Sequence, residues 1–112
     1  MNEISRCSAT VVPTKTFERL LWWVIAGTRG GATRARIISL LKEHPSNASQ
    51  IADQLGLDYK TIRHHIEVLE ENRLLVRVGG KYAAAYFLSS ELESNYGVFK
   101  DILNRSRKTK TD

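Results

Sequence analysis

Apolar side chains recur at helical spacing on both sides of a glycine near the middle of the chain. Ile51 and Leu55 fall on one face of the stretch before Gly56, and this spacing predicts an amphipathic helix. Gly56 stands where a helix end favours a residue that tolerates positive φ. Beyond it, residues 59–72 predict a second helix, one face of which carries the aliphatic side chains Ile62, Ile66 and Leu69. The pattern therefore predicts two short helices joined by a tight turn.

Local capping signals specify both helix starts within residues 47–72. Asn47 is followed three residues later by Gln50, the pattern of a capping box in which each side chain satisfies an unpaired N–H at the helix start. Asp58 is placed to be the N-cap of the second helix. The geometry of this joint is therefore predicted from neighbouring residues alone.

The polar face of the second helix carries groups that suit contact with nucleic acid. Lys and Arg side chains donate to guanine O6 and N7, and Thr can meet a thymine methyl or a phosphate. The first turns of the second helix in a helix-turn-helix contact base edges, so we expect the reading set there: Tyr59, Lys60, Thr61, Arg63 and His64. Glu67 and Glu71 lie farther along this face and would repel phosphate. A solvated helix face is the plain alternative, and the caps, the turn and the segment after the helix together favour DNA contact.

Two runs of alternating apolar and polar residues follow the second helix and flank Gly79 and Gly80. Such alternation around a glycine pair predicts a β-hairpin, here a wing over residues 74–88. Arg77 and Lys81 stand near its tip, where they are placed to touch the sugar-phosphate backbone or to enter a minor groove. Gly-Gly is ordinary hairpin chemistry, so the turn by itself says nothing about DNA.

The two ends of the chain carry further apolar stretches. Residues 16–26 predict a helix that is apolar nearly all round, which must be buried on two sides. Residues 90–106 predict a second helix, opened by a capping box of Ser90 and Glu93. Because Trp is enriched at subunit interfaces, we expect the first helix to supply a dimer interface with the second: Phe17, Leu21, Trp22, Trp23, Ile25, Tyr96, Phe99 and Leu103. For the apolar stripe of the second helix, packing within the core and contact between subunits are equally favoured. Two alternatives stay open, in which the Trp residues cap a small core within one subunit or the first helix follows a membrane segment.

Three arginines surround the start of a further predicted helix over residues 33–43, which Thr33 can cap. Arg29, Arg34 and Arg36 near a helix N-terminus could clamp a phosphate. The expectation we prefer is that they form a solvated face.

The 112 residues suffice for one domain with a modest core, which we place at residues 14–106, between a flexible arm (1–13) and a basic tail (107–112). The net charge of +5 and the pI of about 9.6 suit a polyanionic partner. Residues 46–88, however, carry five Lys and Arg against five Asp and Glu, so the part expected to read DNA has no net charge. DNA binding must then depend on which face holds the cations.

Cysteine usage and hydropathy bear on the compartment. Cys7 is the only cysteine, so no intrachain disulfide can form, and a reducing compartment fits. The longest apolar run, residues 20–26, has seven residues, against the roughly 20 that a membrane span needs. We therefore expect a cytoplasmic protein without a membrane segment.

The second helix and the residues after it resemble a known family. The run from Tyr59 to Leu69, with Asn72-Arg73-Leu74-Leu75 after it, is similar to the recognition-helix signature of ArsR-like winged helix-turn-helix regulators. In that signature a His-Leu pair precedes a Leu-x-x-x-Gly-Leu-Val ending, and His65-Ile66 and Leu74-Leu75 occupy the matching places. Asn72 departs from it, since it stands near where family members often carry Ala and Gly. The likeness covers roughly residues 33–88. It implies a mainly α (α+β) winged helix-turn-helix with N- and C-terminal dimerisation helices and a two-stranded wing.

The resemblance also implies a function and a partner. It implies a homodimeric regulator of transcription that binds double-stranded DNA, with repression by blocking promoter access as the default. Metal-sensing members carry paired cysteines before the turn, or His and Asp ligands along the last helix. Ile51, Ala52 and Asp53 occupy the first region here, and the second has no His. No metal or other cofactor is therefore expected.

The adjacent His64 and His65 do not change that expectation. Neighbouring side chains on a helix point about 100° apart, so these two cannot share one ion. His65 lies at the edge of the apolar face, and we expect it to be a hydrogen-bonded structural residue, as at the similar position in the family.

No pattern in the chain indicates catalysis, because it has neither a glycine-rich phosphate loop nor the signature of a nucleophile beside a base. We therefore expect a protein that is not an enzyme. The rival interpretation is a winged helix that docks on other proteins, and the zero net charge of residues 46–88 is its best support.

Overall fold

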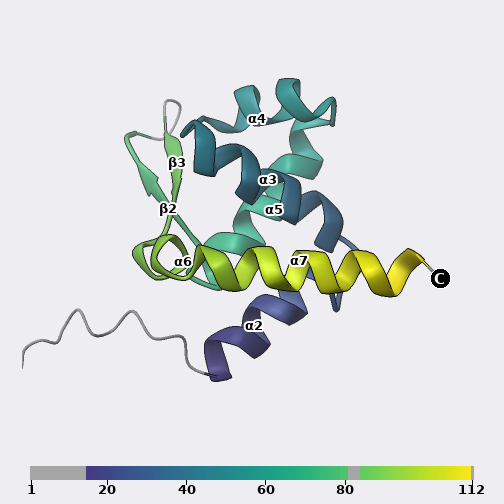
Figure 1. Ribbon diagram of the computed structural model, residues 1–112. Helices are drawn as coiled ribbons and strands as arrows, with labels where there is room; N and C mark the ends of the chain where they lie inside the picture. Colours follow the sequence, from purple (N-terminus) through teal and green to yellow (C-terminus); the bar gives the residue numbers. More distant parts are fainter. Residues whose placement is uncertain (1–14, 81–83, 112) are drawn as a thin grey trace, which may run out of the picture.

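Six helices and one hairpin make up the part of the chain that the structure, a computed structural model, describes: residues 15–80 and 84–111, with side chains to residue 106. In chain order they are α2 (Lys15–Ile25), α3 (Gly31–Glu43), α4 (Ala48–Leu55), α5 (Tyr59–Glu71), β2 (Leu75–Val78), β3 (Ala85–Leu88), α6 (Ser90–Ser94) and α7 (Tyr96–Thr111). In Figure 1, α7 crosses between α2 on one side and the α3, α4 and α5 group on the other, with the hairpin at one edge. The predicted mainly helical fold with a two-stranded antiparallel hairpin is confirmed.

The helix-turn-helix forms as its capping signals predict. The Asn47 side chain accepts from the Gln50 N–H at 2.8 Å, and the Gln50 side chain accepts from the Asn47 N–H at 2.9 Å. Gly56 ends α4 with φ of 67°, in the left-handed region. Asp58 caps α5 by accepting from the Thr61 N–H at 3.1 Å. Neighbouring residues thus fix the orientation of α5.

The hydrophobic core lies between the helix-turn-helix and the terminal helices. Aliphatic side chains on the inner face of α5 are fully buried, and α3 and α2 supply the opposite wall. Phe99 and Ile102 close the core from α7. None of the helices in the described ranges is long and apolar enough to cross a membrane.

The hairpin pairs Leu75 with Leu88 and Val78 with Ala85 in antiparallel register. Opposite residues of such a ladder share a face, so the inner face carries Leu75, Arg77, Tyr86 and Leu88, and the outer face Val76, Val78 and Phe87. The inner residues apart from Arg77 are buried, whereas the three outer ones are exposed. One face of the hairpin is therefore packed against the core, whereas the other face is apolar and exposed to solvent.

The observed helices differ from the predicted ones in four respects. Helix α3 begins at Gly31, with Gly30 as its N-cap, so Thr33 is not the cap. Ser89, not Ser90, caps the C-terminal segment by accepting from the Leu92 N–H at 3.2 Å. That segment is two helices, because Asn95 ends α6 and its side chain donates to the Glu91 carbonyl at 2.9 Å. The second of them, α7, continues to Thr111 and so includes most of the predicted tail. The predicted arm (1–13) lies outside the described residues.

Candidate nucleic-acid interface

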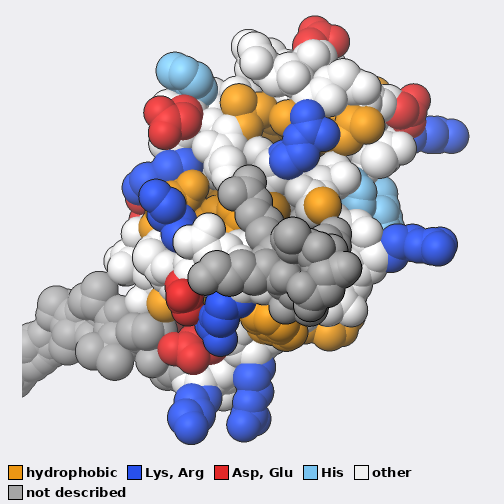
Figure 2. Space-filling model, turned by 45° about the vertical axis from the view of Figure 1, so that its right-hand side comes forward, with side chains coloured by type: hydrophobic (Ala, Val, Ile, Leu, Met, Phe, Trp, Pro, Cys, Tyr) orange, Lys and Arg blue, Asp and Glu red, His pale blue; other side chains and the backbone are white. Residues whose placement is uncertain are grey.

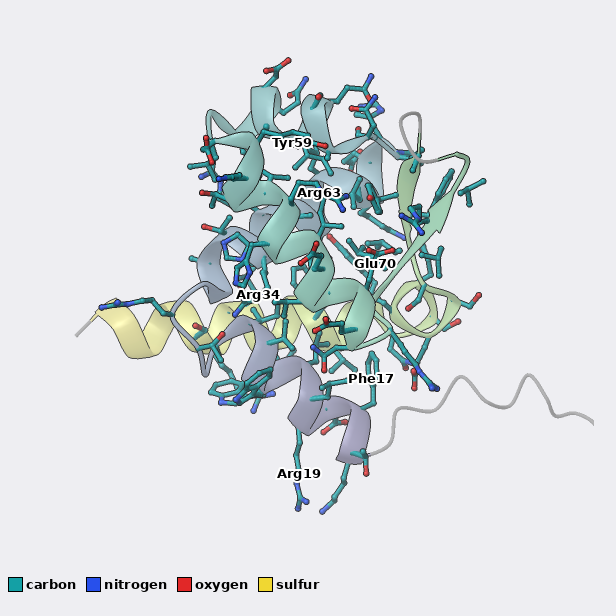
Figure 3. All side chains as sticks on the ribbon, turned by 180° about the vertical axis from the view of Figure 1, so that it is seen from behind. Phe17, Arg19, Arg34, Tyr59, Arg63 and Glu70 are labelled. Carbon is teal, nitrogen blue, oxygen red and sulfur yellow. The ribbon has the colours of Figure 1, made fainter. Side chains whose placement is uncertain are left out.

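The first two turns of α5 present the predicted reading residues outward. Tyr59 is 52% exposed, and Lys60, Thr61 and His64 are exposed beside it. Figure 3 shows Tyr59 near the start of α5 and Arg63 beside this helix on the side of the wing. The opposite side of α5 packs against the core, since Ile62, Ile66 and Leu69 are fully buried. Helix α5 therefore offers a polar surface on an apolar anchor, as a groove-binding helix requires.

Arg63 differs from its neighbours because the wing holds it. Its Nη1 donates to the Tyr86 hydroxyl at 2.7 Å, and its Nη2 lies 3.8 Å from Glu67 Oε2 on the same helix. Partial burial alone would lower the pKa of Arg63, but the attraction and hydrogen bond of Tyr86, together with Tyr59 and Glu67, raise that pKa above its ordinary value. The guanidinium thus stays charged in a fixed place between α5 and β3.

A small polar hollow of about 70 Å³ surrounds this contact. It lies where the starts of α4 and α5 meet the wing, and its lining residues are Asn47, Ala48, Ser49, Tyr59, Arg63, Ala84 and Tyr86. The hollow thus brings two of the predicted reading residues together with two residues of the wing.

Arg77 lies on the same side of the hairpin as this hollow. It is exposed, and its partner across the ladder is Tyr86. Arg77 and Arg63 therefore flank one tyrosine, and the wing adds a cation to the α5 surface. Lys81, the other wing residue that we expected to contact DNA, lies outside the described residues.

The three arginines near α3 do not form a phosphate clamp or a common solvated face. Arg34 is only 5% exposed and donates from Nε to the Val24 carbonyl at 3.0 Å, from Nη1 to His65 Nδ1 at 3.1 Å, and from Nη2 to the Thr28 hydroxyl. Arg29 and Arg36 are exposed. The prediction that the three share one surface was wrong, because Arg34 lies on the same face of α3 as the buried Ile37, Ile38 and Leu41.

His65 is the hydrogen-bonded structural residue that the sequence predicts. It is 7% exposed and contacts Arg34. Burial, then the positive charge of Arg34 and the adjacent His64, lower the pKa of His65 from its ordinary value. Among the described residues no group of three or more His, Cys, Asp or Glu side chains is placed to hold a metal ion.

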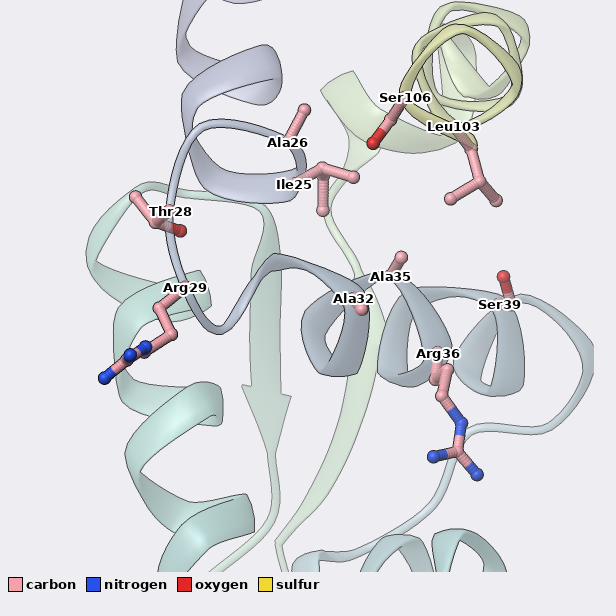
Figure 4. Close-up of a pocket in the computed structure, with 10 residues that line it drawn as sticks. All are labelled: Ile25, Ala26, Thr28, Arg29, Ala32, Ala35, Arg36, Ser39, Leu103 and Ser106. Atoms are coloured by element: carbon pink, nitrogen blue, oxygen red, sulfur yellow. The ribbon is translucent and has the colours of Figure 1, made fainter. Parts of the chain in front are cut away.

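A larger cavity, of about 510 Å³, lies between the end of α2, α3 and α7. Ile25 and Leu103 reach into it from α2 and α7, whereas the guanidinium groups of Arg29 and Arg36 turn outward at its sides (Figure 4). It is remote from the first turns of α5, and nothing in its lining selects one ligand chemistry.

The predicted dimer residues divide into three groups by their burial in a single chain. Phe17, Leu21, Ile25 and Phe99 are buried in the core of a single chain, so a second copy cannot reach them. Tyr96 and Leu103 are half-buried against that core. Trp22 and Trp23 are 39% and 52% exposed. The face in Figure 2 likewise shows hydrophobic side chains reaching the surface between Lys and Arg side chains.

Sequence reasoning missed the role of Tyr86 in the interface and the burial of Arg34 behind it. Tyr86 fits the alternation as an inward residue of the wing, and nothing local to it signals a partner 23 positions away. Arg34 has the character of a surface residue. Gly30 in the sequence was the signal that could have indicated a close contact there. In the structure, a Cβ at this position would lie 2.5 Å from His65 Cε1 and 2.7 Å from Arg34 Nη1.

The helix-turn-helix and the strand after it match a known family. Residues 31–76 match the family model described as "Bacterial regulatory protein, arsR family". A search of the curated proteins gives no significant match.

Solved structures with a similar fold include two transcriptional regulators and a third protein, ZitR. A MarR-family transcriptional regulator from Rhodococcus sp. RHA1 is 21% identical with a TM-score of 0.58, over 93% of this chain and 71% of that one. A MarR/EmrR-family regulator from Acinetobacter sp. ADP1 is 23% identical with a TM-score of 0.53, over 96% and 78%. A mutant of ZitR from Lactococcus lactis is 18% identical with a TM-score of 0.56, over 71% of this chain.

The chain spans 56% of the length of ZitR, and at these identities the likeness shows the fold alone. It is the winged helix-turn-helix fold of regulators of transcription. Together with the family match, it shows that residues 31–76 resemble an arsR-family helix-turn-helix domain and that the chain has the fold of these regulators.

Proposed function

We propose that this chain is a sequence-specific regulator of transcription that places α5 in the major groove of double-stranded DNA. The observation that carries the proposal is the polar surface of the first two turns of α5, which projects from a fully buried apolar face beside the cationic side of the wing. The proposed DNA contacts are Tyr59, Lys60, Thr61, Arg63 and His64 on α5 and Arg77 on the wing. Lys81 is a proposed contact from the wing tip.

Charge limits how α5 can approach DNA. Glu67 and Glu71 are exposed farther along the helix, and close approach of phosphate to them is unfavourable. Lys60 and Arg63 lie in the first two turns, where base edges are contacted in helix-turn-helix proteins. Helix α5 therefore enters the groove with its N-terminal end.

A second copy of the chain would double this surface. Trp22 and Trp23 on α2 expose apolar area that a monomer leaves in water, and Trp is enriched at interfaces. A two-fold dimer through α2 and α7 would present two α5 helices to half-sites about one DNA turn apart. Repression by occupying a promoter in the cytoplasm is the simplest consequence.

The experiment is binding to random and to selected duplexes over a range of salt concentrations. Phosphate contacts release counterions, so the affinity should fall steeply with salt. The double variant Lys60→Ala with Arg63→Ala should lose selection of the operator and keep the circular dichroism spectrum of the folded chain, with a small fall in melting temperature because the Tyr86 hydroxyl loses the Arg63 donor. The matched control is Arg19→Ala with Lys100→Ala, which removes the same two side-chain types from α2 and α7. Figure 3 shows Arg19 far from Tyr59. If the Lys60 and Arg63 variant still selects the same operator, the assignment of α5 as the reading helix is wrong.

One observation supports a second function, docking on another protein. Val76, Val78 and Phe87 form an exposed apolar face on the outer side of the wing, which DNA contact through the inner side would leave free. A wild-type chain whose DNA affinity is negligible at low salt would favour this second function.

A further inference from the structure

Tyr86 joins the wing to the reading helix. Its ring is 2% exposed, and its hydroxyl accepts from Arg63 Nη1 at 2.7 Å. The two residues are 23 positions apart in the chain, so this contact is tertiary. The hydroxyl is the polar end of a side chain that is otherwise packed in the core.

The position of the Tyr86 hydroxyl is fixed both by the wing and by the segment that precedes α4. The Tyr86 N–H donates to the Ser46 carbonyl at 2.8 Å, in a bridge between β3 and the residue just before the Asn47 cap of α4. Across the hairpin Tyr86 is opposite Arg77. A buried ring has few alternative rotamers, so the start of α4 and both wing strands together place its oxygen.

Arg63 depends on such an anchor. An exposed arginine samples many rotamers, and it must lose that freedom to make two parallel hydrogen bonds to a guanine. Tyr86 holds one Nη from the wing, while Glu67 lies near the other at 3.8 Å. A guanidinium has five N–H donors, so these two contacts leave donors for DNA.

We propose that Tyr86 is a positioning residue, which orients the guanidinium of Arg63 toward its base pair and makes base selection by α5 depend on the wing. The inference rests on the proposed DNA-reading function and deepens it. It assigns Tyr86 no contact with DNA, and it predicts a specificity effect from a residue buried behind the reading surface.

The test is Tyr86→Phe, which removes the hydroxyl and keeps the ring. Binding is measured to the selected operator and to operators altered at each base pair in turn. Tyr86→Phe should weaken operator binding about tenfold, which is the cost of ordering an arginine side chain that is free before it binds DNA. It should lose discrimination only at the base pair where Arg63→Ala loses it. In an Arg63→Ala background it should have no further effect.

Two measurements separate positioning from a general structural role. Thr33→Val, which removes a hydroxyl from α3 and keeps the side-chain shape, should leave every base preference unchanged. In the DNA-free protein, the side-chain NMR signals of Arg63 should show hindered rotation that Tyr86→Phe abolishes. Arg63 signals that are the same in both proteins would overturn the inference.

The inference and the function can fail separately. A wild-type chain that selects no sequence overturns the proposed function, and base reading by Arg63 with it. A wild-type chain that selects an operator, with a Tyr86→Phe variant that matches it or that weakens binding equally with and without Arg63, overturns the role of Tyr86 alone.

Discussion

Arg34 and His65 are hydrogen-bonded inside the protein, with 3.1 Å between Nη1 and Nδ1. Because a guanidinium can only donate, Nδ1 of His65 must accept, and its proton lies on Nε2. Arg34 also donates to the Val24 carbonyl at the end of α2 and to the Thr28 hydroxyl. One buried side chain on α3 thus ties α2 to the reading helix α5.

This pair predicts a dependence of stability on pH. The pKa of His65 is lowered by burial, by Arg34 and by His64, so the folded chain takes up a proton on His65 less readily than the unfolded chain does. The stability that neutral His65 contributes is fully present above the ordinary His pKa of 6.5. This contribution is lost as the pH falls below 6.5 toward the lowered pKa of the folded chain. The free energy of unfolding, from urea titrations at pH 7.5 and at pH 5.5, should be smaller at the lower pH.

The matched variants test whether His65 is responsible. His65→Gln keeps an acceptor for Arg34 without titrating, so it should reduce the difference between the two pH values. His64→Gln, on the exposed side of the same helix, should retain most of that difference, because His64 is the smallest of the three causes that lower the pKa of His65. An undiminished difference in the His65→Gln protein would contradict the assignment.

Gly31→Ala should be strongly destabilising. A Cβ at this position would lie 2.0 Å from the Ile25 carbonyl oxygen, and because that atom belongs to the backbone, α2 would have to move. We expect a loss of roughly 3 kcal/mol, at the upper end of overpacking changes. Gly97→Ala is the control, since a Cβ there meets nothing within 4 Å and should stabilise α7 by up to about 1 kcal/mol. Thermal unfolding of the two variants should move in opposite directions.

Asn47→Ala should remove one half of the capping box of α4 and leave the Gln50 N–H without its side-chain acceptor. The expected cost is about 1 kcal/mol, measured by chemical denaturation. Ser49→Ala, at an exposed position in the first turn of the same helix, should change stability by less than about 0.5 kcal/mol. Equal effects of the two substitutions would show that the cap adds nothing.

Trp23→Glu should abolish a dimer that forms through α2. The indole is half exposed in one chain, so the substitution puts a charge on the surface without emptying the core. Light scattering should then give the monomer mass, with an unchanged circular dichroism spectrum. A dimer that survives Trp23→Glu, or a wild-type chain that is already monomeric, would exclude this interface.

The elements that could be predicted from the sequence are those that neighbouring residues determine. Asn47, Gly56 and Asp58 each act on N–H groups or backbone angles within three residues, so their roles follow from spacing alone. Ser89 and Ser90 are adjacent and chemically alike, and the choice between them depends on how α6 packs.

The site residues that could not be predicted act over long distances in the chain. Hydropathy places an arginine on the surface, yet Arg34 is buried because a carbonyl, a hydroxyl and an imidazole from three other segments satisfy it. The partner of Arg63 lies on a strand that comes after α5. From the sequence, all apolar residues of α2 could belong to one dimer interface. Their pattern does not show which of them are covered by α3 and α7 of the same chain.

Arg34 is hydrogen-bonded to both α2 and α5, so it restricts the motion of α2, which carries the exposed tryptophans, relative to the proposed reading helix α5. If two copies join through α2, the separation of their reading helices is set within each chain and no hinge adjusts it. One base pair inserted between the half-sites would turn the second by roughly 35° and shift it by about 3.4 Å. We therefore expect operators of a single spacer length, in which an insertion at the centre is as harmful as a change in the bases that are read.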